Sequence, residues 1–196
     1  MDYTILSDQQ VVQLASDGSE RAFRELIGRY QRPVFSLIYR LVHDRERAED
    51  LAQDTFIKVL NAINRYNPEY KFSSWIFKIA HNTALDHLRR REPKTLSLDG
   101  SPHARTAAET EASTITPESP TETPEQFTLN RELGSEIELA LGTIRPEYRS
   151  AIVLCHVEGR PYEEIAEIME VPLGTVKTYI HRGRKELMLK LEHLRC

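Results

Sequence analysis

The stretch that decides the fold is Lys71–Arg91, KFSSWIFKIAHNTALDHLRRR. Ser73 or Ser74 is expected to cap a helix that begins near Trp75, because a serine hydroxyl accepts a free backbone N–H at a helix start. Behind the cap, apolar and small residues recur at three- and four-residue steps, as in one buried helical face: Trp75, Ile76, Ile79, Ala80, Thr83, Ala84 and Leu88. The stretch therefore predicts an amphipathic helix that ends in three consecutive arginines.

The surroundings of this helix leave two interpretations open. An aromatic loop, RYNPEYKF at 65–72, leads into it. Aromatic side chains can hold unstacked bases while cations hold the phosphates, so the combination favours contact with nucleic acid. The alternative is a core helix whose arginines lie in solvent and favour the negative end of the helix dipole.

Composition narrows the class of protein. The chain has 196 residues, enough for one large or two small domains, and its 40% hydrophobic and 29% charged residues are ordinary for a globular protein. No run approaches the roughly 20 apolar residues of a membrane span, and the N-terminus does not resemble a signal peptide. Cys155 and Cys196 have no metal-ligand spacing, and Cys155 is expected in the core. We expect a cytoplasmic protein with no direct membrane insertion.

No pattern in the chain indicates an enzyme or a cofactor. There is no glycine-rich phosphate loop, no metal-ligand cluster and no nucleophile–base pair that a sequence can reveal. We therefore expect no cofactor and no catalytic residue.

Charge is distributed unevenly along the chain. The net charge is −4, yet residues 71–91 hold five basic and one acidic side chain, and residues 174–195 hold six basic and two acidic ones. Two basic islands in an acidic protein indicate contact with DNA at two places.

Residues 45–63 predict a helix with two different faces. One face is apolar: Ala48, Leu51, Ala52, Thr55, Phe56, Val59, Ala62 and Ile63. The opposite face carries Asp50, Gln53, Asp54 and Asn61, with Ile57 among them. An apolar residue ringed by acids and amides suits a basic, partly apolar protein surface, although a single exposed isoleucine is also common without any role.

Two helical segments flank a region of different composition. Residues 92–128 hold five of the ten prolines and twelve serines or threonines. Such a segment cannot bury enough apolar surface to offset the entropy of ordering. We predict an all-α protein with two small helical domains, 1–92 and 129–196, joined by a disordered acidic linker at 93–128. Within the first domain, Pro33 is expected to kink or break a helix over 20–42 near Gln31-Arg32.

The second domain ends in a predicted helix-turn-helix. Pro161 stands at the start of one helix, VPLG at 171–174 forms a tight turn, and the next helix packs through Val176, Ile180 and Gly183. The second helix of such a motif enters the major groove by its N-terminal half. That half presents mostly polar and basic side chains: Thr175, Lys177, Thr178, His181 and Arg182, with Arg184 and Lys185 beyond. An ordinary helical hairpin with a basic face is the alternative.

Three motifs, in this order and spacing, resemble the extracytoplasmic-function (ECF, group 4) sigma factors of the sigma-70 family. They are AEDLAQDTFIKVL (48–60), FSSWIFKIAHNTALDHLRR (72–90) and YEEIAEIMEVPLGTVKTYIHRGRKEL (162–187). The resemblance covers roughly 19–92 and 130–193 and implies an alternative RNA polymerase sigma factor. It also implies three partners, which are core RNA polymerase through its β′ clamp helices and β flap, promoter DNA, and an anti-sigma factor.

The resemblance implies a role for residues of each motif. The first motif resembles the segment that binds the β′ clamp helices, which implies this contact for Asp50, Gln53, Asp54 and Ile57. The second resembles the segment that recognises and opens the −10 element, which implies DNA contacts by Tyr66, Lys71, Phe72, Ser74, Asn82, Arg89 and Arg90. The third resembles the −35 reader, which implies base or phosphate contacts by Thr175, Lys177, Thr178, His181, Arg182, Arg184 and Lys185. Trp75 is expected in the domain core.

The chain departs from the family pattern in two places. Tyr179 stands where many relatives carry an arginine, which implies one weaker phosphate contact. The linker is long and acidic for the family, and its acids could mimic RNA in the RNA exit path of the polymerase. Two further hypotheses are a stand-alone helix-turn-helix regulator, which predicts a dimer on a palindromic site, and an enzyme with a DNA-binding tail.

Overall fold

Every regular secondary-structure element in the described part of the chain is a helix. The computed structural model describes residues 3–91 and 124–192. In chain order the elements are η1 (Tyr3–Ile5), α1 (Asp8–Ser16), α2 (Glu20–Val42), α3 (Arg45–Ala62), η2 (Ile63–Arg65), α4 (Phe72–Arg91), α5 (Pro124–Thr143), α6 (Pro146–Ile152), the π-helix η3 (Val153–Val157), α7 (Tyr162–Met169) and α8 (Leu173–Lys190). These two ranges contain no strand, so the all-α prediction is confirmed for them. Most of the predicted linker lies outside the described residues, but α5 begins at Pro124, inside the end of that segment.

Short polar side chains set the starts of the first three α-helices. Ser7 and Gln10 form a capping box at α1, with the Gln10 backbone N–H donating to the Ser7 hydroxyl. Ser19 caps α2 and Asp44 caps α3 in the same way, each accepting a backbone N–H from three residues on. These contacts satisfy donors that have no partner inside a helix.

Helix α2 passes through Pro33 as one helix, so of the two predicted alternatives the break near 31–32 is wrong, and the kink stays a prediction. An internal proline removes one hydrogen bond and crowds the preceding turn, which costs roughly 3 kcal/mol. Tyr30, Val34 and Leu37 are buried on both sides of it. Burying each such side chain contributes about 1.5–3 kcal/mol, which offsets the proline and keeps the helix whole.

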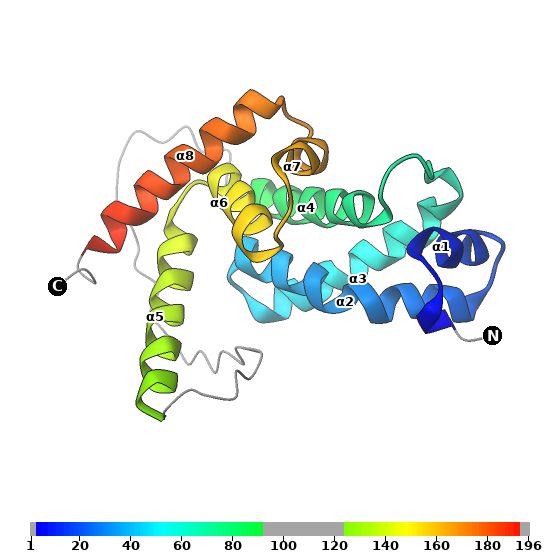
Figure 1. Cartoon of the computed structure of the whole chain (residues 1–196), viewed down its shortest axis with the longest axis horizontal. Coiled ribbons are helices and arrows are strands. Elements are labelled where there is room, and N and C mark those ends of the chain that lie inside the picture. The colour runs from blue at the N-terminus through cyan, green and yellow to red at the C-terminus, as the bar shows by residue number, and fades with distance from the viewer. Residues whose placement is uncertain (1–2, 92–123, 193–196) are drawn as a thin grey trace.

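Helices α1 to α4 form one bundle (Figure 1). Helix α2 packs against α1, α3 and α4, and α3 also packs against α4. Each helix contributes one apolar face to the interior: Leu26, Val34, Leu37, Ile38, Leu41, Ala48, Leu51, Val59, Ile76, Ala80 and Ala84 are among the buried residues. The stripe predicted on α4 therefore packs as expected.

Helices α7 and α8 form the predicted helix-turn-helix, and α6 packs against α8. Gly159 and Glu170 adopt positive φ angles of 64° and 55°, and they turn the chain at the two ends of α7. Helices α6 and α8 approach closely at Gly183, where an added Cβ would lie 2.5 Å from Ile152 Cδ1 and 3.2 Å from Tyr148 Cβ. A larger residue at position 183 would require the Ile152 side chain to shift and Tyr148 to move by a few tenths of an ångström.

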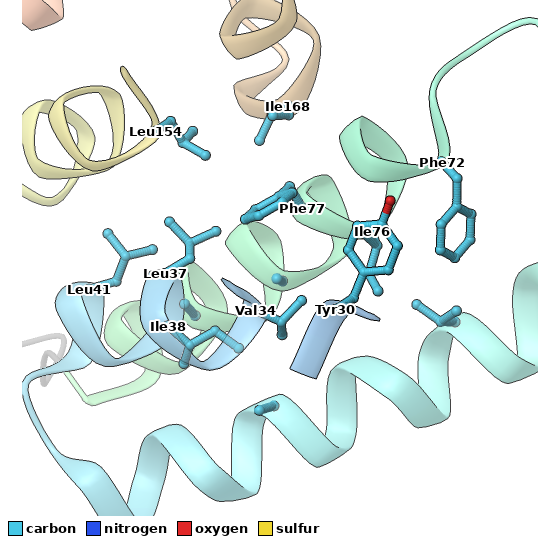
Figure 2. Packing of buried hydrophobic residues seen from close by; sticks show 14 of the residues in the cluster. Tyr30, Val34, Leu37, Ile38, Leu41, Phe72, Ile76, Phe77, Leu154 and Ile168 are labelled. Atoms are coloured by element: carbon cyan, nitrogen blue, oxygen red, sulfur yellow. The ribbon is translucent and has the colours of Figure 1, made fainter. Parts of the chain in front are cut away.

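The two halves of the chain pack directly on one another. Helix α7 lies on α4, and α2 contacts α5 and α6. Figure 2 shows the ring of Phe77 on α4 beside Ile168 of α7, with Leu154 of η3 above Leu37 of α2. One continuous apolar cluster contains residues of both halves.

A buried arginine joins the halves at the other end of this interface. Arg149 Nη1 donates to the Leu41 carbonyl at 2.5 Å, and Nη2 donates to the Gly142 carbonyl at 2.6 Å and to the Ile144 carbonyl at 3.0 Å. His43 ends α2 with a φ of 53°. Burial, and then the charges of Arg149 and Arg40, lower the pKa of His43 to about 4. The neutral imidazole is therefore the form that fits this junction.

Candidate nucleic-acid and polymerase interfaces

The basic face of α8 is open to solvent. Val176, Ile180 and Gly183 are buried on one side of the helix, and the predicted −35 residues lie on the other. Six of these are exposed, namely Lys177, Thr178, His181, Arg182, Arg184 and Lys185, and Thr175 is half-buried. The helix N-terminus, with the Thr175 N–H bonded to the Pro172 carbonyl at 2.8 Å, stands at the outer end of this face.

Two arginines of the α8 face have partners on neighbouring elements that the sequence reading did not include. The Arg184 guanidinium donates to His156 Nε2 at 3.1 Å and 2.9 Å. Burial and the charge of Arg184 lower the pKa of His156, so the neutral ring accepts this bond. A hydrogen bond with Tyr148 raises the pKa of Arg182. Both partners precede α7 in the chain, so periodicity within α8 could not identify them.

The departure at Tyr179 has a structural setting. Its ring packs on Tyr148, with centroids 5.5 Å apart, and the side chain is half-buried. The residue therefore belongs to the packing of α8 on α6 rather than to the open basic face.

The aromatic loop before α4 is a packed cluster. Tyr66 meets Phe72 edge-on at 5.6 Å and Trp75 at 5.4 Å, and its hydroxyl donates to the Tyr70 carbonyl. Phe72 is only 2% exposed and packs against Tyr30. Trp75 packs partly buried against the same core, as expected. Of the two aromatics predicted to meet DNA, Tyr66 is half-buried, whereas Phe72 lies in the core and supports the loop from within.

The start of α4 differs from the prediction. The helix begins at Phe72, and the Trp75 N–H bonds to the Lys71 carbonyl at 3.2 Å, so Ser73 and Ser74 lie inside the first turn. The predicted serine cap is therefore wrong. The Ser74 hydroxyl instead donates to a carboxylate from the other half of the chain, Glu164 of α7, at 2.8 Å.

Glu164 is the centre of a polar cluster between α4 and α7. Its carboxylate also accepts from Arg160 Nη1 at 2.8 Å and from Lys71 Nζ at 3.4 Å. Burial tends to raise the pKa of Glu164, but the Ser74 hydrogen bond and the charges of Arg160 and Lys71 outweigh it and lower the pKa. The carboxylate is thus ionised and 6% exposed. The structure brings Lys71 and Ser74 together around an acid that the sequence analysis assigned to no site.

The remaining predicted −10 residues lie along α4. Asn82 is exposed, and its amide donates to Glu170 at 3.4 Å. Arg89 and Arg90 are exposed near the end of the helix, where Arg89 lies 3.8 Å from Asp86. Asn82 and the two arginines are therefore about two turns apart on one helix.

Helix α3 presents the predicted polymerase surface to solvent. Asp50, Gln53 and Asp54 are exposed on it, and Ile57 is 57% exposed. The structure adds Leu60, which is 51% exposed and continues the same line one turn further. The sequence contained the signal for Leu60, since it lies three residues after Ile57 in an otherwise polar face.

Residues 3–91 and 124–192 contain neither a candidate membrane span nor a candidate metal site. None of the helices described there is both long and apolar enough to cross a bilayer. Those ranges also hold no group of histidine, cysteine or acidic side chains placed to bind a metal ion. Cys155 is a half-buried free thiol.

Comparison with known proteins gives consistent matches over both halves. The chain matches the family models Sigma-70 region 2, over residues 26–93, and Sigma-70, region 4, over residues 135–187. It is 37% identical over 163 residues to the ECF RNA polymerase sigma factor SigE of Mycolicibacterium smegmatis, covering 83% of this chain and 59% of that one. It is 34% identical over 189 residues to the RNA polymerase sigma-H factor of Pseudomonas aeruginosa, covering 95% of each.

Solved structures share the fold. CnrH, solved with the cytosolic domain of CnrY, gives a TM-score of 0.68 at 22% identity, covering 95% of this chain and 97% of CnrH. The sigma factor RpoE from Bartonella quintana, solved with the anti-sigma factor NepR, gives 0.64 at 24% identity, covering 87% and 96%. The matched regions contain the three motifs in order, which excludes the stand-alone regulator and the enzyme. The chain belongs to the ECF sigma factors of the sigma-70 family and is an alternative RNA polymerase sigma factor, a protein of transcription initiation.

Proposed function

We propose that this chain holds core RNA polymerase through α3, opens and reads the −10 element through the loop at 65–72 and α4, and reads the −35 element through α8. The observation that carries the proposal is the pairing of two exposed surfaces of different character. One is acidic and apolar, on α3, and the other is basic, at a helix N-terminus on α8. On this proposal the protein acts in the cytoplasm, on DNA.

The α3 surface supports a protein contact. Ile57 and Leu60 offer an apolar centre of two large side chains more than half exposed. Asp50, Gln53 and Asp54 surround it with acids and an amide. Protein interfaces commonly have an apolar core with a charged rim that sets orientation, so a basic, partly apolar helix pair such as the β′ clamp helices fits this surface.

The α8 surface supports reading of duplex DNA. Lys177 and Arg182 offer charged donors, and Thr178 and His181 offer short-range polar groups near the helix start. Base edges in the major groove are read by such side chains, and phosphates by the cations and the helix N-terminus. The β flap of the polymerase is the proposed support for this half of the chain.

The −10 surface supports capture of single-stranded bases. Extruding a base costs a few kcal/mol, least at easily unstacked A·T-rich steps, and contacts to the holoenzyme offset that cost. The polar contacts would come from Lys71, which directly precedes α4, and from Asn82, Arg89 and Arg90 on that helix. Tyr66 belongs to the loop in which a flipped base would lie. No nucleotide hydrolysis is required on this proposal.

Run-off transcription tests the whole proposal. Core polymerase alone is compared with core plus the full chain, on a promoter taken from upstream of its own gene. We expect a new transcript only with the chain present. An unchanged set of transcripts would refute the proposal.

Pull-down of core polymerase by the full chain tests the α3 contact separately. Asp54→Arg is expected to reduce capture at least about tenfold, which is the loss of about 1.4 kcal/mol typical of a central interface residue. Glu20→Arg makes the same change of charge at an exposed position of α2 and is expected to retain capture. Equal capture by both variants would rule out the α3 assignment.

An anti-sigma factor is the remaining proposed partner. The exposed α3 and α8 surfaces are the ones such a protein would have to cover to block polymerase and DNA. Co-purification of the tagged chain from its own cells, with and without added core polymerase, tests whether a partner competes with core for the α3 surface.

A further inference from the structure

We propose that Gln9 of α1 is a positioning residue for the loop at 65–72, and that it holds the loop in the shape that takes an unstacked −10 base. The proposal rests on the function proposed above for that loop, because Gln9 acts through the loop rather than on DNA. Helix α1 lies ahead of the Sigma-70 region 2 match, which begins at residue 26, and none of the three motifs includes it. A role for α1 therefore has to be argued from its contacts.

Helix α1 contacts the loop, and the short helix that leads into it, through two side chains. Gln9 Nε2 donates to the Pro68 carbonyl at 3.1 Å, and the Ser16 hydroxyl donates to Asn64 Oδ1 at 2.8 Å. Asn64 belongs to η2, whereas Pro68 lies at the turn in the middle of the loop. Figure 1 shows α1 beside the stretch of chain between η2 and α4. The helix therefore holds the loop at its entry and at its turn.

Hydrogen bonds within the loop set the shape of its turn. Asn67 Oδ1 accepts the Glu69 N–H at 3.0 Å, and the Asn67 carbonyl accepts the Tyr70 N–H at 3.2 Å. An asparagine side chain that bonds the backbone two residues on is typical of such turns. The Pro68 carbonyl bonds to α1 instead, so the contact with Gln9 links this closed turn to the helices of the bundle.

Helix α1 is itself fixed to the aromatic cluster that supports the loop. The Asp8 carboxylate accepts hydrogen bonds from the Tyr30 hydroxyl and, at 2.8 Å, from Arg29 Nη1. Burial, and then the hydrogen bond to Asp8, raise the pKa of Tyr30, so its hydroxyl keeps the proton that it donates. The Tyr30 ring meets Phe72 edge-on at 5.4 Å (Figure 2), and Phe72 meets Tyr66 of the loop in the same way. Because α1 and the loop share these fixed neighbours, α1 can set where the loop lies.

The positioned loop presents an aromatic and a basic side chain to solvent. The Tyr70 ring is 56% exposed, and Arg65 is exposed as well. An aromatic face can stack on a base while a cation meets the backbone phosphates. A loop already held in its binding shape loses less conformational entropy when the base arrives, so the contact with Gln9 is expected to strengthen capture of the −10 strand. Reading of the −35 duplex should not depend on Gln9, since that surface lies on α8.

Hydrogen exchange of the full chain without DNA tests the positioning. Gln9→Ala removes the donor, and we expect the backbone amides at 67–71 to exchange about two- to tenfold faster, as for the loss of one hydrogen bond. Gln13→Ala is the matched control, because Gln13 is the same exposed residue one turn further along α1 and donates to Asp17 at the end of its own helix. Equal exchange at 67–71 in the two variants would overturn the proposal.

A third variant separates the hydrogen bond from the stability of α1. Gln9→Lys keeps a donor for the Pro68 carbonyl, but it places a positive charge in the first turn of α1, where the helix dipole disfavours it. We therefore expect wild-type exchange in the loop, together with a free energy of unfolding no higher than that of Gln9→Ala. If loop exchange followed the free energy of unfolding across the variants, rather than the presence of a donor at position 9, the positioning role would be refuted.

Binding of the −10 strand by the holoenzyme tests the consequence for DNA. The probe is a labelled single-stranded oligonucleotide that carries the non-template −10 sequence from upstream of the chain's own gene. Gln9→Ala is expected to bind it about two- to tenfold more weakly than Gln13→Ala, with −35 duplex bound equally by both. Both variants are neutral, so a change of charge near the DNA cannot explain the difference. Equal affinity of the two variants for the −10 strand would overturn the proposal.

The function of the loop and its positioning by Gln9 fail in different ways. If the wild-type holoenzyme did not bind the −10 strand, the function proposed for the loop would fall, while hydrogen exchange would still decide whether Gln9 positions it. If Gln9→Ala loosened the loop but left the affinity of the holoenzyme for the strand unchanged, the contact would not serve DNA capture, and the inference would be refuted.

Discussion

Replacing Arg149 by methionine removes the three hydrogen bonds that join α6 to the carbonyl ends of α2 and α5. A hydrogen bond from a charged donor contributes about 1.5–3 kcal/mol, and an acceptor left buried without a partner loses its hydration as well. Part of that lost free energy is recovered, because methionine removes the cost of burying a charge. Arg149 Nε makes no hydrogen bond, so its removal adds no further loss. We therefore expect the free energy of unfolding to fall by about 3 kcal/mol.

Thermal and urea denaturation of the full chain measure that loss. For a protein of this length, 1 kcal/mol shifts the melting temperature by roughly 2–4 °C, so Arg149→Met should melt about 6–12 °C lower. Arg145→Met is the control, because Arg145 is exposed and only lies over the Tyr148 ring at 5.9 Å. It should change stability by no more than about 1 kcal/mol. If the two variants were equally stable, the three carbonyls would not depend on the guanidinium and the reasoning would be refuted.

Three further predictions concern the pH response, the close helix contact and the DNA surface. The pKa of His43 is lowered from 6.5 to about 4, so the neutral ring's contribution to the free energy of unfolding is present above pH 6.5 and is lost as the pH falls through 4. In urea denaturation between these pH values, His43→Asn should remove about 3 kcal/mol of the pH dependence of that free energy. An unchanged dependence of the free energy of unfolding on pH would contradict this prediction. Gly183→Val should cost about 1–3 kcal/mol in denaturation, with part of the loss recovered by Ile152→Val, whereas a fully stable single variant would show that α6 and α8 can move apart. Lys177→Ala should weaken binding of the holoenzyme to −35 duplex and reduce the salt slope by about one, and an identical slope would exclude a phosphate contact.

The sequence alone predicted the buried face of those helices whose apolar residues recur with a helical period. The apolar stripe of α4 and the buried face of α3 follow a helical period, because each packs against a single layer of neighbours. The helix-turn-helix was predictable for a similar reason, since its turn and its packing residues are close in sequence. Leu60 could have been added to the α3 surface from the same periodicity.

The contacts between the two halves could not be predicted. Glu164 belongs to an acidic run with Glu163, Glu167 and Glu170, which by pattern alone indicates a solvated helix face. Its burial depends on Ser74 and Lys71, which are about ninety residues away in the sequence. Hydrogen-bond partners at such separations are set by how two domains dock, and no local period encodes that docking.

Helix α4 carries a second stripe that only the docked structure explains. Ser74, Phe77, Lys78 and Asn82 follow at three- and four-residue steps on the side opposite the core stripe, and each has a partner on α7 or beside it. A face meant only for burial would be apolar, and a face meant only for solvent would not carry a fully buried phenylalanine. Its mixed polarity matches the docking of α7, since Phe77 is buried there while Ser74 pairs with Glu164 and Lys78 and Asn82 pair with Glu170.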